Sequence, residues 1–414
     1  MPPVWNQLMA ARAANMKASA IRDTFKLTER SDIISFGGGF PSVEAFPHDL
    51  VAEISAELAM DPSGAALQYG PTEGFYGLRE AIAENMRRQG IDVRAENVLV
   101  TGGSQQALDL LGKVFLNRHD PIIVEKPTYI GGLSAMTNYL ADPISVTLDN
   151  DGIRTDELEA VLEQRRREGL PMPKLCYIIP NFHNPTGVTL SRERRARIVE
   201  LAEEYDFIVI EDNPYGELRF EGSGQPHIKT FDAYGRVFYL GSYSKVFLPG
   251  IRVGWIVGDE TVIQKLAIAK QGTDLCGGSF GQQLVLEFHR RNLLEPLLVE
   301  LKNLYRRKRD LMLAALGEHF PEEVEWTYPE GGFFIWVTLP PYMDAQAMLL
   351  DAMEEERVAY VGGGAFFADG TGKNTIRLAY SQASDEQIVE GIRRLGRFLK
   401  SRIKTTRPSL AASN

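Results

Sequence analysis

A lysine that follows two serines could form a covalent bond to a cofactor in this chain. Lys245 comes after Ser242 and Ser244, and Arg252 lies further along the same segment. A lysine amine condenses with a carbonyl group to give a Schiff base, while hydroxyls and a guanidinium bind a phosphate dianion. Pyridoxal phosphate is a cofactor that carries both groups. The segment 241–255 therefore predicts a pyridoxal-phosphate site, and a solvated lysine in a Ser/Gly loop is the alternative.

Polar residues also follow two apolar runs that predict strands. Asp212 and Tyr215 come after the run 207–211, and Asn184 comes after the run 175–179. The carboxyl ends of parallel strands are where such sheets bind ligands. Asp212 could pair with a pyridine nitrogen, and Tyr215 and Asn184 could donate hydrogen bonds to the phenolic oxygen of the ring. Without a ligand, Asp212 would be a turn or N-cap residue and 184–187 a simple turn.

A glycine-rich junction between a strand and a helix offers a second phosphate contact. Gly103, Ser104 and Gln105 follow the predicted strand 98–101 and open a helix over 105–116. Free backbone N–H groups and the positive end of the helix dipole both attract a phosphate. Further along, Tyr129 could stack on the pyridine face, although a core position is the commoner fate of a tyrosine.

One arginine stands inside an apolar strand near the end of the chain. Arg377 lies in the run 376–380, whose neighbours are apolar. Burying a guanidinium without a partner is costly, so such an arginine usually faces a carboxylate. That carboxylate could belong to a substrate or to an internal salt bridge.

Short apolar runs alternate with helical segments through the middle of the chain. This pattern predicts a mostly parallel sheet with helices on both faces, an α/β fold. After residue 293 the pattern changes to a long helix over 294–316, a strand over 331–337, and helices over 344–356 and 385–402. A helix over 16–30 and a strand over 33–36 precede the sheet. We expect a large domain over 46–293 and a smaller α+β domain built from 1–45 and 294–414. The remaining predicted strands of the large domain are 121–125, 237–241 and 253–258, and its other predicted helix ends near 205.

Composition and charge exclude several classes of function. The chain has 45 basic and 55 acidic residues, a net charge of −10, which argues against a broad nucleic-acid surface. With only Cys176 and Cys276 present, neither a disulfide framework nor a thiolate metal site is available, and no metal is expected. Neither a signal peptide nor a membrane span is evident. We expect a cytoplasmic enzyme with no membrane or nucleic-acid partner.

Together these motifs resemble those of the fold-type-I pyridoxal-phosphate aminotransferases, classes I and II. The resemblance covers nearly the whole chain and rests on Asn-Pro-Thr-Gly at 184–187, Asp-x-x-Tyr at 212–215, Ser-x-Ser-Lys at 242–245 with Pro-Gly-x-Arg at 249–252, and Arg377. It implies the transferase fold of that type, with pyridoxal 5′-phosphate as cofactor. Segments 19–22 and 35–41 are similar to the 2-aminoadipate, kynurenine and aromatic aminotransferase branch.

The resemblance implies a role for each candidate residue. Lys245, Asp212 and Tyr129 would be catalytic, and Arg377 would bind the substrate carboxylate with help from Asn184 and the backbone near Gly39. Arg22 would meet acidic substrate side chains. The cofactor would be held by Gly103, Ser104, Gln105, Tyr129, Asn184, Asp212, Tyr215, Ser242, Ser244, Lys245, Arg252 and Tyr69.

Tyr69 is similar to a tyrosine that reaches the phosphate of the neighbouring subunit, so a homodimer with shared active sites is implied. The loop 276–281 is richer in glycine than is usual for the family at this place, which leaves side-chain specificity open.

The expected reaction moves an amino group from an L-amino acid to a 2-oxo acid, 2-oxoglutarate being the expected acceptor, by a ping-pong mechanism. The expected donor is 2-aminoadipate-like, aromatic or large and apolar. A decarboxylase, lyase or racemase on the same scaffold is the main alternative. A transcription regulator would need a DNA-binding module ahead of the domain, and we expect the 35 residues before Phe36 to be too few for one.

Overall fold

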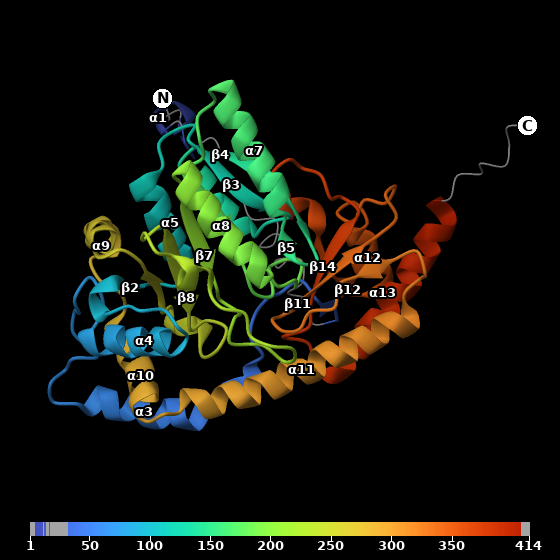
Figure 1. The fold of residues 1–414 in the computed structure, drawn as a ribbon. Coiled ribbons are helices and arrows are strands. Elements are labelled where there is room, and N and C mark those ends of the chain that lie inside the picture. Colours follow the sequence, from blue (N-terminus) through green and yellow to red (C-terminus); the bar gives the residue numbers. More distant parts are fainter. Residues whose placement is uncertain (1–4, 11, 14–15, 17–31, 407–414) are drawn as a thin grey trace, which may run out of the picture.

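The computed structural model describes residues 5–10, 12–13, 16 and 32–406 (Figure 1). Its centre is an eight-stranded sheet in the order β2-β9-β8-β7-β6-β3-β4-β5. Neighbouring strands from β8 to β4 are parallel, whereas β9, β2 and β5 join antiparallel at the two edges. The expectation of an α/β fold with a mostly parallel sheet is therefore confirmed. The strands are β2 (Val98–Thr101), β3 (Pro121–Lys126), β4 (Asp142–Asp149), β5 (Gly152–Ile153), β6 (Leu175–Ile178), β7 (Ile208–Asp212), β8 (Val237–Ser242) and β9 (Gly254–Val257).

Helices cover both faces of this sheet, because successive side chains of a strand point to opposite sides. Ile122 and Val124 of β3 belong to the core under α5, α6 and α9, whereas Ile123 belongs to the core under α7 and α8. Figure 1 shows α7 and α8 in front of the strands. The helices are α5 (Ser104–Phe115), α6 (Ile130–Thr137), α7 (Thr155–Glu168), α8 (Arg192–Tyr205) and α9 (Glu260–Asp274).

A second sheet, of four antiparallel strands, lies in the C-terminal part of the chain. Its order is β10-β11-β14-β13, and α12 and α13 accompany it. The N-terminal segment joins this part, because β1 pairs in parallel with β12 and the Ala379 N–H donates to the Phe36 carbonyl at 2.8 Å. The bounds are β1 (Ile34–Ser35), β10 (Glu325–Trp326), β11 (Phe334–Thr338), α12 (Leu349–Glu356), β12 (Val358–Ala359), β13 (Val361–Gly362), β14 (Thr375–Ala379) and α13 (Asp385–Thr406).

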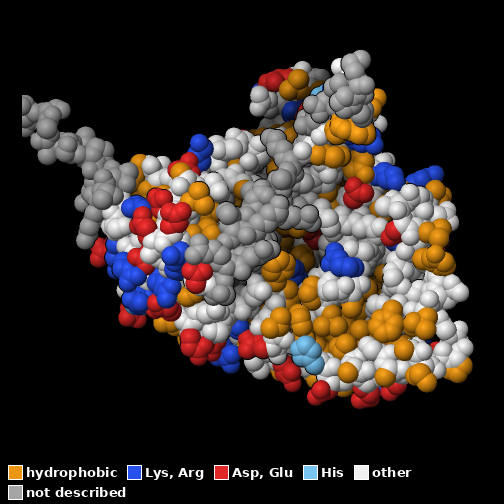
Figure 2. All heavy atoms as spheres, turned by 180° about the vertical axis from the view of Figure 1, so that it is seen from behind, with side chains coloured by type: hydrophobic (Ala, Val, Ile, Leu, Met, Phe, Trp, Pro, Cys, Tyr) orange, Lys and Arg blue, Asp and Glu red, His pale blue; other side chains and the backbone are white. Residues whose placement is uncertain are grey.

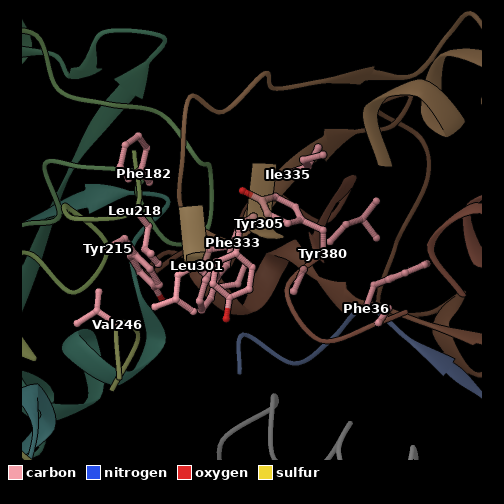
Figure 3. Close-up of a cluster of buried hydrophobic side chains, with 14 of the residues drawn as sticks. Phe36, Phe182, Tyr215, Leu218, Val246, Leu301, Tyr305, Phe333, Ile335 and Tyr380 are labelled. Atoms are coloured by element: carbon pink, nitrogen blue, oxygen red, sulfur yellow. The ribbon is translucent and has the colours of Figure 1, made fainter. Parts of the chain in front are cut away.

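One hydrophobic cluster connects the two sheets. Figure 3 shows Tyr215 and Leu218, from the loop after β7, beside Phe333 and Tyr305 from the C-terminal part. The ring centroids of Tyr215 and Phe333 are 5.4 Å apart. Helix α11 (Leu294–His319) spans both parts along the lower edge of Figure 1, from the side of α3 (His48–Met60), α4 (Tyr76–Arg88) and α10 (Ser279–Arg290) to α13. The remaining helix is α1 (Trp5–Leu8).

The strands and helices predicted from sequence occur within a few residues of their expected places. The strand predicted for 331–337 spans 334–338, and the helix predicted for 344–356 begins only at 349. The helix predicted for 16–30 lies almost entirely outside the described residues. Within the described ranges, no helix combines the length and the apolar character that a bilayer crossing requires.

A buried arginine fixes the loop that follows β6. Arg195 of α8 has no exposed surface, and its guanidinium donates four hydrogen bonds of 2.8–3.1 Å. Because three of these acceptors lie in segment 180–190, Arg195 anchors the backbone on both sides of Asn184. The acceptors are the carbonyl oxygens of Leu190, Pro226 and Pro180 and Oδ1 of Asn181.

Replacing Arg195 with leucine should lower the free energy of unfolding by about 3 kcal/mol, because buried carbonyl oxygens lose their donor. Urea unfolding followed by circular dichroism measures this change. Arg197→Leu on the same helix is the control. Its ion pairs with Glu159 and Glu200 are partly exposed, so its loss should stay below about 1 kcal/mol. Equal losses in the two variants would contradict the anchoring role.

Candidate active site

The polar segments predicted from sequence meet at one edge of the large sheet. Strands β6, β7 and β8 are parallel neighbours, so their carboxyl ends lie side by side. Asn184 follows β6, Asp212 ends β7, and Lys245 follows β8. This is the edge at which open α/β sheets bind ligands.

Lys245 is half-buried, and its amine faces the N-terminal segment. Its Nζ donates to the Gly39 carbonyl at 2.8 Å and lies about 6 Å from the ring centroids of Tyr215 and Phe333. Burial and, to a smaller extent, the positive charges of Arg377 and Arg252 together lower the pKa of Lys245 from 10.5 to about 8. A larger fraction of this amine is therefore neutral at physiological pH than of an ordinary lysine.

The carboxylate of Asp212 is buried, and only one of its two oxygens has a hydrogen-bond donor among the described residues. Its Oδ2 accepts a hydrogen bond of 2.8 Å from the Tyr177 hydroxyl, and its Oδ1 has no partner among the described residues. Burial, opposed by the Tyr177 hydrogen bond and assisted by the charge of Glu125, raises the pKa of Asp212 to about 7. A buried acceptor without a donor is costly. The free Oδ1 therefore fits the protonated ring nitrogen of pyridoxal phosphate.

The predicted phosphate-binding residues lie where α5 begins. Gly103 has a φ of +90°, and a Cβ there would lie 2.5 Å from Nη2 of Arg252. That guanidinium donates to the Gly102 carbonyl at 3.0 Å and to Ser244 Oγ at 3.3 Å. Only glycine therefore combines this backbone conformation with the close approach of Arg252.

Free donors remain around this turn. Ser104 Oγ is buried without a partner among the described residues, and Gly103 caps α5 without a side-chain hydrogen bond. Ser242 Oγ accepts from the Ser244 N–H at 3.1 Å. The Gln105 side chain is exposed and donates to the Gly131 carbonyl at 2.9 Å. A phosphate at this helix N-terminus would find hydroxyl, guanidinium and backbone donors together.

Arg377 is buried in β14 with neutral partners only. It donates to Asn184 Oδ1 at 2.9 Å and to the Gly37 carbonyl at 2.6 Å, and its Nε has no partner in the described part of the chain. Its carbon Cζ lies 4.5 and 5.1 Å from the ring centroids of Phe334 and Phe366. Burial lowers the pKa of Arg377 to about 10. No internal salt bridge engages it among the described residues, so its charge is available to a substrate carboxylate.

Two tyrosines complete the ring-binding region. Tyr215 is buried, and burial raises its pKa, which a hydrogen bond with Asn184 partly offsets. Tyr129 lies directly before α6, and burial together with the charge of Asp212 raises its pKa. A Cβ at Gly131 would come 2.5 Å from the Tyr129 hydroxyl. Glycine at that position therefore leaves room for the ring.

The predicted roles of Tyr69, which is expected to act in the neighbouring subunit, and of Arg22 stay predictions. The side chain of Tyr69 is 79% exposed, and Arg22 lies outside the described residues. Tyr177, Glu125, Phe334 and Phe366 contribute to the site but were absent from the sequence prediction. The sequence does place Tyr177 in an apolar strand next to the strand of Asp212, and this position could have indicated its role.

Comparisons with known proteins agree on one family. The family described as aminotransferase class I and II matches residues 31–395. Aromatic-amino-acid aminotransferase 1 of Thermococcus litoralis is 45% identical over 97% of this chain and 96% of its own length.

Two solved structures are similar over their full length. The kynurenine aminotransferase of Pyrococcus horikoshii, in complex with PMP, has a TM-score of 0.93 at 44% identity and covers 97% of this chain and 98% of that one. The alpha-aminoadipate aminotransferase of Thermus thermophilus, complexed with N-(5′-phosphopyridoxyl)-L-leucine, has a TM-score of 0.90 at 39% identity and covers 98% and 100%.

In cofactor-free protein, the Lys245 amine should react with formaldehyde and cyanoborohydride along a pH curve centred near 8. The reason is that the amine is neutral above this pKa and protonated below it. Mass spectrometry of the peptide that contains Lys245 measures the rate. The Arg377→Met variant removes one positive charge and should move the curve to higher pH. A midpoint at the ordinary lysine pKa in the unmodified chain would refute the assignment.

Proposed function

Because this chain belongs to the class I and II aminotransferases, which use pyridoxal phosphate, we propose that its amino donor is a 2-aminoadipate-like, aromatic or large apolar L-amino acid. Its acceptor in this proposal is 2-oxoglutarate. Relatives named for aromatic amino acids, kynurenine and alpha-aminoadipate support this donor class. They favour amino transfer over decarboxylation, elimination or racemisation. The two half-reactions share one cofactor, so ping-pong kinetics are expected.

The observation that carries the mechanism is a half-buried lysine amine with a lowered pKa at the same sheet edge as a buried carboxylate whose Oδ1 has no partner among the described residues. The cofactor supplies an aldehyde that the amine can bind and a ring that withdraws electrons. Lys245 would bind the aldehyde, and Asp212 Oδ1 would hold a proton on the ring nitrogen. Tyr215 and Asn184 would hold the phenolic oxygen, and Tyr129 would cover the ring. The phosphate would be held by Gly103, Ser104, Gln105, Ser242, Ser244 and Arg252.

Substrate orientation and proton transfer follow from the remaining contacts. Arg377 binds the α-carboxylate through the guanidinium that Asn184 and Gly37 already hold in place. Once the substrate amine has displaced it from the aldehyde, Lys245 Nζ, neutral above a pKa of about 8, would accept the proton from the substrate Cα. The rings of Phe334 and Phe366 cover the Arg377 guanidinium and limit the access of water to it. The role of Arg22 toward an acidic side chain stays a prediction.

An exposed apolar surface supports the homodimer. Figure 2 shows hydrophobic side chains gathered over the side that carries α3 and α10. Thr72 Oγ1 donates to the Leu275 carbonyl at 2.7 Å, so the segment of Tyr69 contacts the residue directly before the glycine-rich loop 276–281. A surface of this kind usually marks a protein interface. The exposed large hydrophobic residues between positions 40 and 76 and directly before the glycine-rich loop are Phe40, Val43, Leu50, Met60, Leu67, Tyr69, Tyr76 and Leu275.

We also propose two domains and a cytoplasmic location. The large sheet falls within 46–293 and the four-stranded sheet within 294–414, and β1 attaches the N-terminal segment to the latter. Both cysteines are free, Cys176 in the core and Cys276 in a loop. Free thiols are typical of proteins in reducing compartments.

A panel of amino donors with 2-oxoglutarate should place 2-aminoadipate, kynurenine and phenylalanine above alanine and aspartate. Glutamate formation measures the transfer, and kcat/KM ranks the donors. Lys245→Ala is the control and should form no glutamate, because the amine that moves the proton is absent. Preference for aspartate would contradict the proposed donor class, and release of CO2 or ammonia without glutamate would contradict the acceptor reaction.

Shared active sites should be visible by complementation between two inactive or weakened variants. Loss of a phosphate contact in Tyr69→Ala should weaken cofactor binding about tenfold or more. A heterodimer of Lys245→Ala and Tyr69→Ala contains one site with both residues intact. Co-expressed, differently tagged chains should therefore recover activity above the sum of the two parent dimers. Activity equal to that sum, or a monomer in sedimentation equilibrium, would refute site sharing.

A further inference from the structure

One hydrogen bond holds the buried carboxylate of Asp212. The Tyr177 hydroxyl donates to Oδ2 at 2.8 Å. Among the described residues, no donor binds the other oxygen, Oδ1. A carboxylate bound through one oxygen keeps its other oxygen in a fixed direction only if that bond persists. The direction in which Oδ1 faces a ligand therefore depends on the position of the Tyr177 ring.

The sheet places the two side chains on the same face. Tyr177 of β6 pairs in register with Ile210 of β7, and Asp212 follows two residues later. Because side chains alternate along a strand, Ile210 and Asp212 share a face, and Tyr177 and Ile210 belong to the same core cluster. The Tyr177 side chain of β6 therefore extends diagonally to the Asp212 carboxylate at the end of the neighbouring strand, β7.

A glycine on α6 leaves the space that this ring occupies. A Cβ at Gly132 would lie 2.4 Å from Cζ of Tyr177 and 2.6 Å from its hydroxyl oxygen. A Cβ at the preceding residue, Gly131, would likewise collide with the Tyr129 ring. Two glycines in the first turn of a helix disfavour it by about 1 kcal/mol each relative to alanine. The close approach of two tyrosine rings accounts for their presence in this helix.

The surroundings of Tyr177 and Asp212 keep the tyrosine hydroxyl protonated, so that it remains a hydrogen-bond donor. Burial and the neighbouring carboxylates raise the pKa of Tyr177 well above its usual value, so its hydroxyl keeps its proton. Glu125, buried on β3, repels a negative charge on Asp212. The hydroxyl is thus the group that stabilises the Asp212 anion against both burial and repulsion.

We propose that Tyr177 is a positioning residue for the reaction: its hydroxyl holds Asp212 with Oδ1 directed at the ring nitrogen of the cofactor, and Gly132 admits its ring. This rests on the proposed function, in which Asp212 binds that nitrogen. Tyr177 does not touch the reacting atoms and acts through Asp212.

Binding to cofactor-free protein tests this without turnover. The probes are pyridoxamine 5′-phosphate and its 1-deaza analogue, in which a carbon replaces the ring nitrogen, and tryptophan fluorescence reports Kd. Tyr177→Phe keeps the ring and removes the hydroxyl. We expect it to weaken binding of pyridoxamine 5′-phosphate about tenfold or more and to leave binding of the deaza analogue within about twofold. Gly132→Ala, which displaces the ring, should act in the same direction.

Two control variants separate the possible outcomes. Tyr360→Phe removes another buried hydroxyl, which donates to the Ala345 carbonyl at 2.9 Å, and should leave both affinities unchanged. Asp212→Asn should lower the affinity for pyridoxamine 5′-phosphate but not for the deaza analogue. Equal weakening of both probes by Tyr177→Phe would show a merely structural role, and no weakening would also overturn the inference. If Asp212→Asn itself fails to distinguish the probes, the proposed pairing of Asp212 fails as well.

Discussion

Charged and polar groups are buried here without their full set of partners, and the site depends on that incompleteness. Asp212 Oδ1, Arg377 Nε and Ser104 Oγ are all buried and unpaired among the described residues. Each unpaired buried group costs free energy that the rest of the fold must offset. In the proposed function these groups meet a ring nitrogen, a substrate carboxylate and a phosphate, so binding of cofactor and substrate would remove the cost. The site is therefore organised for its ligands before they arrive.

Close approach of side chains to backbone is the second constraint, and glycine makes it possible. At Gly103 the positive φ lets the Arg252 guanidinium reach the turn that opens α5. At Gly132 the missing Cβ admits the Tyr177 ring against α6. In both places the glycine weakens the local element and is explained only by the residue that it faces. Local propensity and site geometry conflict at these positions, and the geometry prevails.

Sequence reasoning recovered the parts of the site that are encoded locally. Asn184, Asp212 and Lys245 each follow an apolar run, and parallel pairing alone then brings them to one edge. Helices α3 and α4 were not predicted, because Pro47 and Phe75 precede them instead of capping residues. The hydrogen bonds of Arg377 were not predicted, since Gly37 and Asn184 are 340 and 193 positions away and the Gly37 acceptor is a backbone carbonyl, which the residue type does not reveal.

The N-terminal segment 36–40 shows how such distant contacts serve one purpose. Four of its carbonyl oxygens accept hydrogen bonds. The Phe36 carbonyl binds the backbone of β14, and the Gly37 carbonyl binds Arg377. The Gly39 carbonyl binds Lys245, and the Phe40 carbonyl binds Ser381. Pairing of β1 with β12 fixes where the segment begins, and a Cβ at Gly39 would lie 2.6 Å from the Phe334 ring. The same short backbone therefore sets the position of the lysine on the large sheet and of the arginine on the small one. Backbone hydrogen bonds of one segment thus hold both the Lys245 amine and the Arg377 guanidinium, and they do so only while position 39 carries no side chain that would displace the Phe334 ring.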